Sequence, residues 1–488
     1  MNSPKRTLIK GALWAVGTRW SIKGIGFLNT VIMARLLLPA DYGLVAMAML
    51  IVGLIQALMD FGATAALLRK GEVSTSEINS AWTLRILQSL GVALLLLVAS
   101  PLAAAYFVEP RVQPVLWVLA ACVALGGAEN IGLTLAQKAF QFSVEFRVNV
   151  LSKLLSVVAT LVAGYFLRDY RALVIGIATG YLAGLALSYL LHPYRPRWET
   201  SKMGEIWGVT KWLMLAGVGN FLLRNSDEVA AGRIGSTGDF GLYHTGSDLG
   251  RLPVGQLGPS MMRAFLPVLS SIQADVPRTN NAVLKTLAAV NAITLPMGFG
   301  MAAIALPFTH FVLGDKWLDA APFVALFALV GSAQFALNPL TALLFLRGHT
   351  RIMNTVSWIE FAVFVAASLI LVPHFYLMGM GIARLLASLA NSVVLSFSAR
   401  RHCNIELDKL LLSIGRPLVG SVFMYFIVTH VLKMRQDDGI QLFISIMVGA
   451  CFYSVWLLGS WIALGKPEGL ESTVWDALGS NLLRLHNN

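Results

Sequence analysis

Charged residues are scarce in this sequence: Asp, Glu, Lys and Arg make up 13% of the 488 residues, whereas 57% are hydrophobic. An ordinary soluble domain carries roughly 25% charged residues. Uncharged stretches such as 86–108, 286–314 and 439–465 each exceed the roughly 20 residues that an apolar helix needs to cross a bilayer. Because such stretches recur along the whole length, no sizeable soluble domain is left. The composition therefore predicts an all-α polytopic membrane protein.

The sequence also lacks the motifs of common catalytic and metal sites. It has no Gly-Lys-Ser/Thr phosphate loop, so the chain is not expected to hydrolyse ATP, and no Gly-x-Ser-x-Gly nucleophile elbow. The three cysteines, Cys122, Cys403 and Cys451, fit neither a disulfide framework nor a metal-ligand spacing. The outer connections are too short to hold the reactive groups of a membrane polymerase or ligase. We therefore expect no enzyme, no catalytic residue, no metal and no cofactor, with H⁺ or Na⁺ left open as a coupling ion.

The charged and Gly/Pro-rich joints of the sequence predict fourteen membrane-spanning helices. They run approximately over 10–36, 42–67, 81–107, 112–135, 148–167, 172–192, 205–230, 239–270, 284–312, 319–346, 352–372, 376–399, 414–434 and 439–464. Lys and Arg are concentrated in alternate connections, which places both termini in the cytoplasm. The first segment is too charged for a signal peptide, so we expect the N-terminus to be retained.

The net charge of +12 follows this bias of Lys and Arg toward the inner leaflet, where anionic lipid headgroups attract them. The sequence contains no run of basic residues interleaved with aromatics, which a nucleic-acid surface would need. Membrane lipids are therefore expected partners, and nucleic acid is not.

A short phrase occurs twice, as Asp-Tyr-Gly-Leu over 41–44 and as Asp-Phe-Gly-Leu over 239–242. Further along, the segments that begin at Arg147 and Arg351 also resemble each other. These matches predict two six-helix lobes related by pseudo-two-fold symmetry, residues 1–198 and 199–402. Two additional helices and a cytoplasmic tail follow in 403–488. Parallel repeats of this kind are typical of transporters that move one half against the other.

Ionisable side chains inside spans are costly in lipid and by default face a cavity or a partner. Arg19 and Lys23 share one helix face, where their like charges favour a bound anion. Five cations are predicted to line a cavity for an anionic substrate: Arg19, Lys23, Arg224, Arg251 and Arg384. Four acids are candidates for ion coupling: Asp227, Glu228, Asp248 and Glu360. Local ion pairing of Arg224 with Glu228, and of Asp248 with Arg251, is a compatible alternative.

Other intramembrane charges are interpreted as interfacial, because long side chains near span ends can reach the membrane surface. They are Arg35, Arg85, Lys153, Lys211, Arg263, Asp60 and Glu129. His244 is expected only to be hydrated and receives no role.

Several motifs in order resemble polysaccharide flippases of the multidrug/oligosaccharidyl-lipid/polysaccharide exporter superfamily, most closely the branch that contains the colanic-acid exporter. They occupy 37–44, 137–142, 235–242, 265–269 with Gln273, and 314–317 before Pro322. The resemblance implies two six-helix lobes in a V, two extra helices and a central cationic cavity.

The resemblance also implies transport by alternating access in a bacterial inner membrane. The implied substrate is an undecaprenyl-pyrophosphate-linked oligosaccharide, carried from the cytoplasmic to the periplasmic leaflet for export of a surface polysaccharide of the exopolysaccharide, capsule or O-antigen type. The polymerase and export machinery of the same pathway are implied partners. A cation-coupled multidrug exporter of the same fold is the first alternative, and a membrane glycan polymerase or ligase is the second.

Overall fold

The computed structural model describes residues 4–59, 67, 73–433, 438–463 and 465. Within these residues the chain is almost wholly helical and contains no strand. Nine helices of the described part are long and apolar enough to span a membrane, and the bent pair α5 (Val112–Gly127) and α6 (Gly132–Lys138) would make a tenth. The prediction of an all-α polytopic membrane protein is confirmed. The number of fourteen spans stays a prediction.

The chain divides into two compact units, residues 1–241 and 242–488. This grouping follows contacts between elements: α9 (Met203–Ile234) packs on α2 (Pro39–Met59) and α4 (Thr75–Phe107) and therefore belongs to the first unit. The predicted lobes 1–198 and 199–402 and the segment 403–488 follow the internal repeat instead, and they stay predictions.

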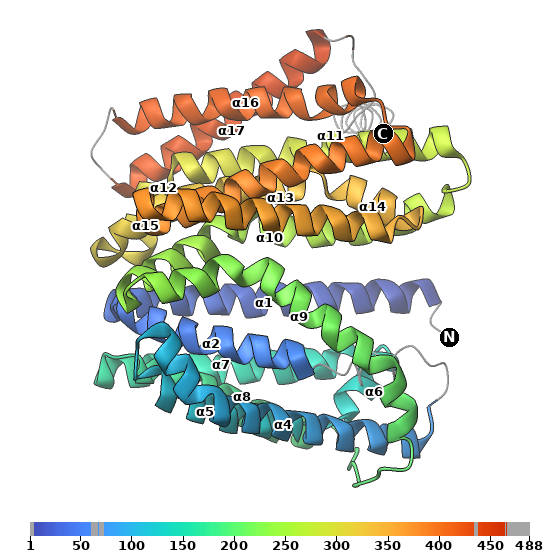
Figure 1. Cartoon of the computed structure of the whole chain (residues 1–488), viewed down its shortest axis with the longest axis vertical. Coiled ribbons are helices and arrows are strands. Elements are labelled where there is room, and N and C mark those ends of the chain that lie inside the picture. The colour runs from blue at the N-terminus through green and yellow to red at the C-terminus, as the bar shows by residue number, and fades with distance from the viewer. Residues whose placement is uncertain (1–3, 60–66, 68–72, 434–437, 464, 466–488) are drawn as a thin grey trace, which may run out of the picture. The chain divides into compact units, whose positions relative to one another are not determined.

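The first unit also contains α1 (Pro4–Leu36), α7 (Phe142–Leu167) and α8 (Arg171–Leu191). Within this unit, α7 packs along α8 and α1, and α4 packs along α5 (Figure 1). The helix α4 begins where the sequence supplies a side-chain cap. Ser74 and Glu77 form a reciprocal capping box at the start of α4, which satisfies backbone N–H groups that the first helical turn leaves unpaired.

Close packing of α7 on α8 depends on small residues. A Cβ atom at Gly176 would lie 1.7 Å from Thr160 Oγ1, and one at Gly180 would lie 3.3 Å from Ser156 Cβ. Ser156 Oγ donates a hydrogen bond of 2.7 Å to Gly176 O. Small side chains let membrane helices approach closely, and here they allow the polar face of α7 to lie directly against α8.

The fourth predicted span is broken, whereas the tenth is interrupted only at Leu337. In the first repeat, α5 and α6 meet at an angle of 56°, and Arg85 Nη2 donates 2.9 Å to the carbonyl of Gly126 at the break. In the second repeat, α13 (Ala321–Ala336) gives way to α14 (Asn338–Leu346), and Asn291 Nδ2 donates 2.9 Å to Ala336 O. A break frees backbone carbonyls that must find new donors in a membrane, and a charged side chain serves in one repeat and a neutral amide in the other.

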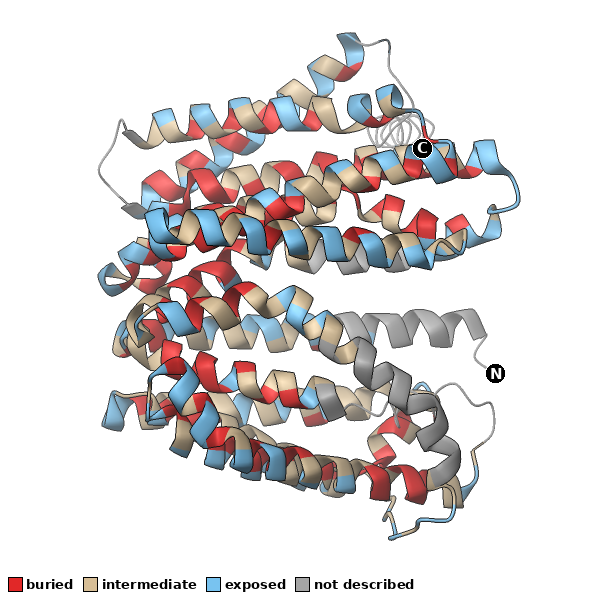
Figure 2. Ribbon diagram, viewed as in Figure 1, coloured by how far each residue is buried: buried red, intermediate tan, exposed pale blue. Residues whose placement is uncertain are grey.

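The second unit begins within α10 (Thr237–Ser271). Its other elements are α11 (Val276–Ala303), α12 (Ala305–Leu313), η1 (Asp315–Ala320), α13, α14, α15 (Thr350–Cys403), α16 (Leu407–Lys433) and α17 (Asp438–Ala463). A buried core of this unit, red in Figure 2, lies along α11 and α13. Leu287 and Leu340 belong to a cluster of fully buried side chains between α11, α14 and the C-terminal end of α15.

The long helix α15 is two helices joined at a kink. Tyr376 has non-helical backbone angles, φ 53° and ψ −137°, three residues after Pro373. Proline removes a helical hydrogen bond and disfavours helix before it. The two spans predicted over 352–372 and 376–399 meet at this kink. Each of the other predicted spans likewise overlaps one helix or a run of two or three consecutive helical elements.

The doubled Asp-aromatic-Gly phrase lies at the start of α2 and at the start of α10, and its two glycines touch. A Cβ atom at Gly43 would lie 1.9 Å from Thr237 O and 2.9 Å from Gly241 N. A Cβ atom at Gly241 would lie 1.9 Å from Pro39 O. All four residues belong to the first unit. Only glycine permits backbones to approach this closely, so the phrase marks a helix crossing as well as two turns.

Candidate functional site

A cavity of about 1060 Å³ lies inside the first unit, between helices of the first repeat. Its lining comes from α1, α2, α4, α5, the α5–α6 break, α7 and α8. The polar lining residues are Gln56, Arg85, Gln88, Ser89, Glu129, Asn149, Ser152, Lys153, Ser156 and Tyr181. Intramembrane polar groups of this density mark a path for a polar solute rather than a packed core.

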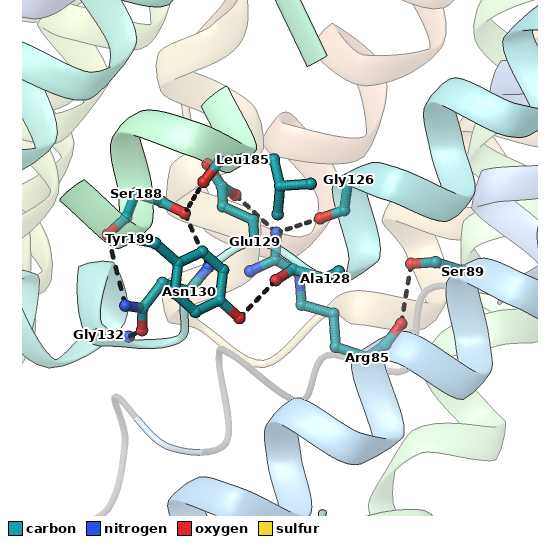
Figure 3. A network of polar contacts seen from close by, with 10 residues as sticks. All are labelled: Arg85, Ser89, Gly126, Ala128, Glu129, Asn130, Gly132, Leu185, Ser188 and Tyr189. Carbon is teal, nitrogen blue, oxygen red and sulfur yellow. Dashed lines mark hydrogen bonds and ion pairs between the residues drawn. The ribbon is translucent and has the colours of Figure 1, made fainter. Parts of the chain in front are cut away.

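Arg85 and Glu129 form an ion pair on one wall of the cavity. Arg85 Nη2 lies 2.7 Å from Glu129 Oε2, and both side chains are about a quarter exposed, at 26% and 27%. Figure 3 shows Arg85 reaching from α4 to the break, where the same guanidinium also meets Gly126 O. The carboxylate neutralises the guanidinium, so this pair adds polarity to the wall without adding net charge.

A hydrogen-bond network holds the break in place behind the ion pair (Figure 3). Asn130 is completely buried, and its Nδ2 donates 2.8 Å to Tyr194 O while its Oδ1 accepts from Gly132 N at 2.8 Å. Ser188 Oγ accepts from Asn130 N, and Tyr189 Oη donates 2.9 Å to Ala128 O. Satisfied polar networks of this kind rigidify buried structure, so the backbone segment that bears Glu129 is held in a fixed position.

A second part of the lining is a polar stripe on α7. Asn149, Ser152, Lys153 and Ser156 recur at spacings of three and four residues, which places them on one helix face. All four line the cavity and are partly buried. The stripe carries one cation and three neutral hydrogen-bonding groups.

Lys153 is the cation of the cavity that lacks a carboxylate partner. Within the part of the chain that the structure describes, no acidic side chain pairs with Lys153, whereas Arg85 pairs with Glu129. A Cβ atom at Gly26 of α1 would lie 3.6 Å from Lys153 Cε and 3.8 Å from Nζ. The lining therefore holds two cations and one carboxylate, and its excess positive charge belongs to Lys153.

Of the five predicted cavity cations, Arg19, Lys23 and Arg224 lie in the first unit. Arg19 and Lys23 are exposed on α1, and Arg224 is exposed on α9. None of the three belongs to the lining of the cavity, although Ile22, next to Lys23, does. Their proposed contact with a substrate stays a prediction.

The other two predicted cations lie in the second unit, each over an aromatic ring. The guanidinium of Arg251 lies 4.5 Å from the ring centre of Phe327. Arg384 is buried, and its guanidinium lies 5.6 Å from the ring centre of Phe364. Such cation–π contacts stabilise a cation in an apolar setting. A substrate role for Arg251 and Arg384 stays a prediction.

The four predicted coupling acids lie on α9, α10 and α15. Asp227 and Glu228 are buried on α9. Asp248 lies 3.8 Å from His244 Nε2, so His244, which we had left without a role, has a specific neighbour. Glu360 is partly buried and interacts electrostatically with Arg384, a pairing that the sequence had left open. Whether any of these four acids binds a coupling ion stays a prediction.

Arg85, Glu129 and Lys153 are predicted to be interfacial, and all three line the cavity; whether they also reach the membrane surface stays a prediction. The helix that carries Lys153 begins at Phe142, earlier than the predicted start at 148, so Lys153 lies about 16 Å along α7 at the usual helical rise. The spacing Asn149, Ser152, Lys153 and Ser156 was visible in the sequence as a polar stripe within an apolar span. Asp60 and the side chains of Lys211 and Arg263 lie outside the described residues.

The sequence matches the polysaccharide biosynthesis protein family over residues 32–322, which is more than half of the chain. The chain belongs to this family. The predicted relationship to polysaccharide exporters is thereby confirmed at the level of the family.

Two curated relatives and one solved structure extend this result. The chain is 23% identical over 403 residues to the lipopolysaccharide biosynthesis protein WzxC of Escherichia coli, covering 81% of each sequence. It is 23% identical over 330 residues to the succinoglycan biosynthesis transport protein ExoT of Rhizobium meliloti, covering 66% of each. Its fold resembles the lipid II flippase MurJ in an inward closed conformation, with a TM-score of 0.73, 13% identity, and 93% of this chain and 99% of that chain covered.

Proposed function

We propose that this protein flips a lipid-linked oligosaccharide across the bacterial inner membrane for export of a surface polysaccharide. The carrier lipid is undecaprenyl pyrophosphate, and the direction is from the cytoplasmic to the periplasmic leaflet. The observation that carries the proposal is a polar, net positive cavity inside a polytopic member of a polysaccharide biosynthesis family. The names of WzxC, a lipopolysaccharide biosynthesis protein, and ExoT, a transport protein, support it.

The chemistry of the substrate fits this arrangement. A lipid-linked glycan has a polar head that cannot cross hydrocarbon unaided and an apolar tail that has no reason to leave it. The cavity offers amides, hydroxyls and an amine to the head, while the tail remains in the bilayer. Alternating access between the two leaflets would then move the head through the protein, with both termini in the cytoplasm. The polymerase and export machinery of the same pathway would take over the product.

The energy source is proposed as a proton or a sodium ion bound by Asp227, Glu228, Asp248 or Glu360. A multidrug exporter of the same fold would favour an acidic cavity, because its typical substrates are cations. The lining of this cavity has the opposite balance, with Arg85 and Lys153 against Glu129. The charge balance therefore favours an anionic substrate.

Flipping in reconstituted liposomes tests the proposal. Liposomes with the purified protein and a fluorescently labelled undecaprenyl-pyrophosphate glycan should transfer label between leaflets faster than protein-free liposomes, as measured by access of a membrane-impermeant quencher. A labelled phospholipid in the same vesicles serves as the control for nonspecific scrambling. Equal rates with and without protein, or equal acceleration of both lipids, would refute the proposed function.

A further inference from the structure

We propose that the ammonium group of Lys153 is the docking point for the diphosphate of the carrier lipid inside the cavity of the first unit. This inference rests on the proposed function and adds to it a named residue, a place and a ligand class. It also assigns substrate binding to a cavity within one unit, built only from residues of the first repeat.

The first argument is the charge balance of the lining. Arg85 is neutralised by Glu129 at 2.7 Å, but no described acidic side chain pairs with Lys153. A partly buried cation without a counter-ion is costly unless an anion or water solvates it. Since α7 begins at Phe142, Lys153 lies about three turns inside the helix.

The second argument is the set of groups around the amine. Asn149, Ser152 and Ser156 share the face of α7 that bears Lys153 and also line the cavity. A diphosphate offers many oxygens, so one cation with a neighbouring amide donor suits it better than a cation alone. The hydroxyls of Ser152 and Ser156 already donate 2.7 Å to Val148 O and Gly176 O, so Asn149 supplies that amide. On the facing helix, a Cβ atom at Gly184 would lie 3.7 Å from Ser152 Oγ and 3.8 Å from Glu129 Oε1, so a glycine at this position leaves space at the polar lining.

The third argument is the space beside the amine. A Cβ at Gly26 would lie 3.8 Å from Lys153 Nζ, in contact with the amine, so a larger side chain on α1 would cover it. The cavity of about 1060 Å³ is at the upper end of the roughly 300–1,000 Å³ typical of small-molecule sites. It can hold a diphosphate with its first sugars, whereas the long lipid tail must stay outside.

The second unit offers a contrast. A pocket of about 530 Å³ between α11, α13, α15 and α16 is lined almost wholly by apolar side chains such as Leu295, Phe299 and Leu418, with Ser332, Ser392 and Ser396 as its hydroxyls. It contains no lysine or arginine. Among the described pockets of the two repeats, the anion-binding chemistry therefore lies in the first.

Binding of short lipid diphosphates to the full-length protein in nanodiscs tests the inference. The probes are farnesyl diphosphate, farnesyl monophosphate, farnesol and a phosphate-free acidic trisaccharide. The wild type should bind farnesyl diphosphate most tightly. Lys153→Gln should weaken that binding about tenfold to one-hundredfold, as expected for loss of a charge-assisted hydrogen bond, and should leave farnesol binding unchanged. Lys153→Arg should retain most of the affinity.

Two further variants separate the site from general effects of charge and folding. Arg147→Gln removes an exposed cation from the same helix and should bind farnesyl diphosphate as the wild type does. Gly26→Leu retains the amine but covers it, and it should weaken diphosphate binding even if Lys153→Gln does not fold. Melting temperatures of all variants show whether each is folded.

Several outcomes would overturn the inference: wild-type protein that binds farnesyl diphosphate no better than farnesol, equal losses in Lys153→Gln and Arg147→Gln, or a Lys153 dependence seen only with the acidic trisaccharide. The liposome assay distinguishes this inference from the proposed function. If Lys153→Gln still flips the lipid, the proposed function stands and the proposed binding site is refuted. If the protein binds the diphosphate through Lys153 but does not flip the lipid, the proposed site stands and the proposed function is refuted.

Discussion

Arg85 and Glu129 meet at 2.7 Å where α5 breaks, and the same guanidinium bonds the carbonyl of Gly126. At the one-residue interruption between α13 and α14, the amide of Asn291 donates to Ala336 O at 2.9 Å. A neutral amide is thus enough to satisfy a backbone carbonyl at such a junction. The charged pair in the first repeat therefore serves something beyond the break, and its position on the cavity wall indicates that this is the polarity of the site.

Removing Arg85 should destabilise the protein more than removing the charge of Glu129. Arg85→Gln leaves a partly buried carboxylate without its cation and leaves Gly126 O with only a backbone donor, Glu129 N at 3.3 Å, at a cost of about 1–3 kcal/mol for the unsatisfied carboxylate. Glu129→Gln retains a hydrogen-bond acceptor and should cost less. Thermal unfolding in one detergent, with the double variant closing the cycle, measures both effects. Equal melting temperatures for the wild type and Arg85→Gln would contradict the assigned contacts.

Hydropathy was sufficient for the fold because a membrane requires each span to satisfy its own backbone. Even the boundary between the spans 352–372 and 376–399 could be read, since Pro373 marks the kink at Tyr376. The cavity could not be predicted from the sequence. The place of Lys153 in the lining depends on how the helices pack, and the pairing of Arg85 with Glu129 depends on a helix break that composition does not reveal. Charges were visible in the sequence, but their partners were not.

The crossing of Gly43 and Gly241 should tolerate no side chain. A methyl group at Gly43 would lie 1.9 Å from Thr237 O, and one at Gly241 would lie 1.9 Å from Pro39 O. Backbone cannot yield as a flexible side chain can, so Gly43→Ala and Gly241→Ala should each lower the melting temperature clearly, with a cost of about 1–3 kcal/mol as in overpacked cores. Gly24→Ala on α1 is the matched control, because nothing lies within 4 Å of a Cβ there. A crossing variant as stable as this control would show that the helices do not touch.

The connection between α4 and α5 should make stability depend on acid pH. Hydrogen bonds from Arg111 hold the pKa of Glu109 at about 2, below its ordinary value of 4.5, against a smaller opposing effect of burial, and Thr237 adds a further bond. Because the folded state favours the carboxylate, this contribution is full above about pH 4.5 and is lost as the pH falls from there toward 2.

Glu109→Gln should therefore lower the melting temperature near neutral pH, and the difference from the wild type should shrink as the pH falls below 4.5. The effect should stay below about 1 kcal/mol, since Arg111 is 53% exposed and solvent screens such pairs. Glu406→Gln, which removes an exposed pair with Lys409, is the control. A difference from the wild type that grows toward low pH would have the wrong sign and would reject the assignment.

Arg19 and Lys23 allow a test of the original cavity hypothesis apart from the cavity observed in the first unit. Both side chains are exposed on α1, so a double substitution to alanine should leave the melting temperature almost unchanged. If the two cations receive the anionic head of the substrate on its way into the protein, the double variant should lower the flipping rate about tenfold, the scale of one lost charge-assisted contact. Because neither residue lines the cavity, the double variant should bind farnesyl diphosphate as tightly as the wild type.

Arg147→Ala, which removes an exposed cation from α7, controls for surface charge. Flipping at the wild-type rate in the double variant would show that these two cations serve the membrane surface and not the transport path.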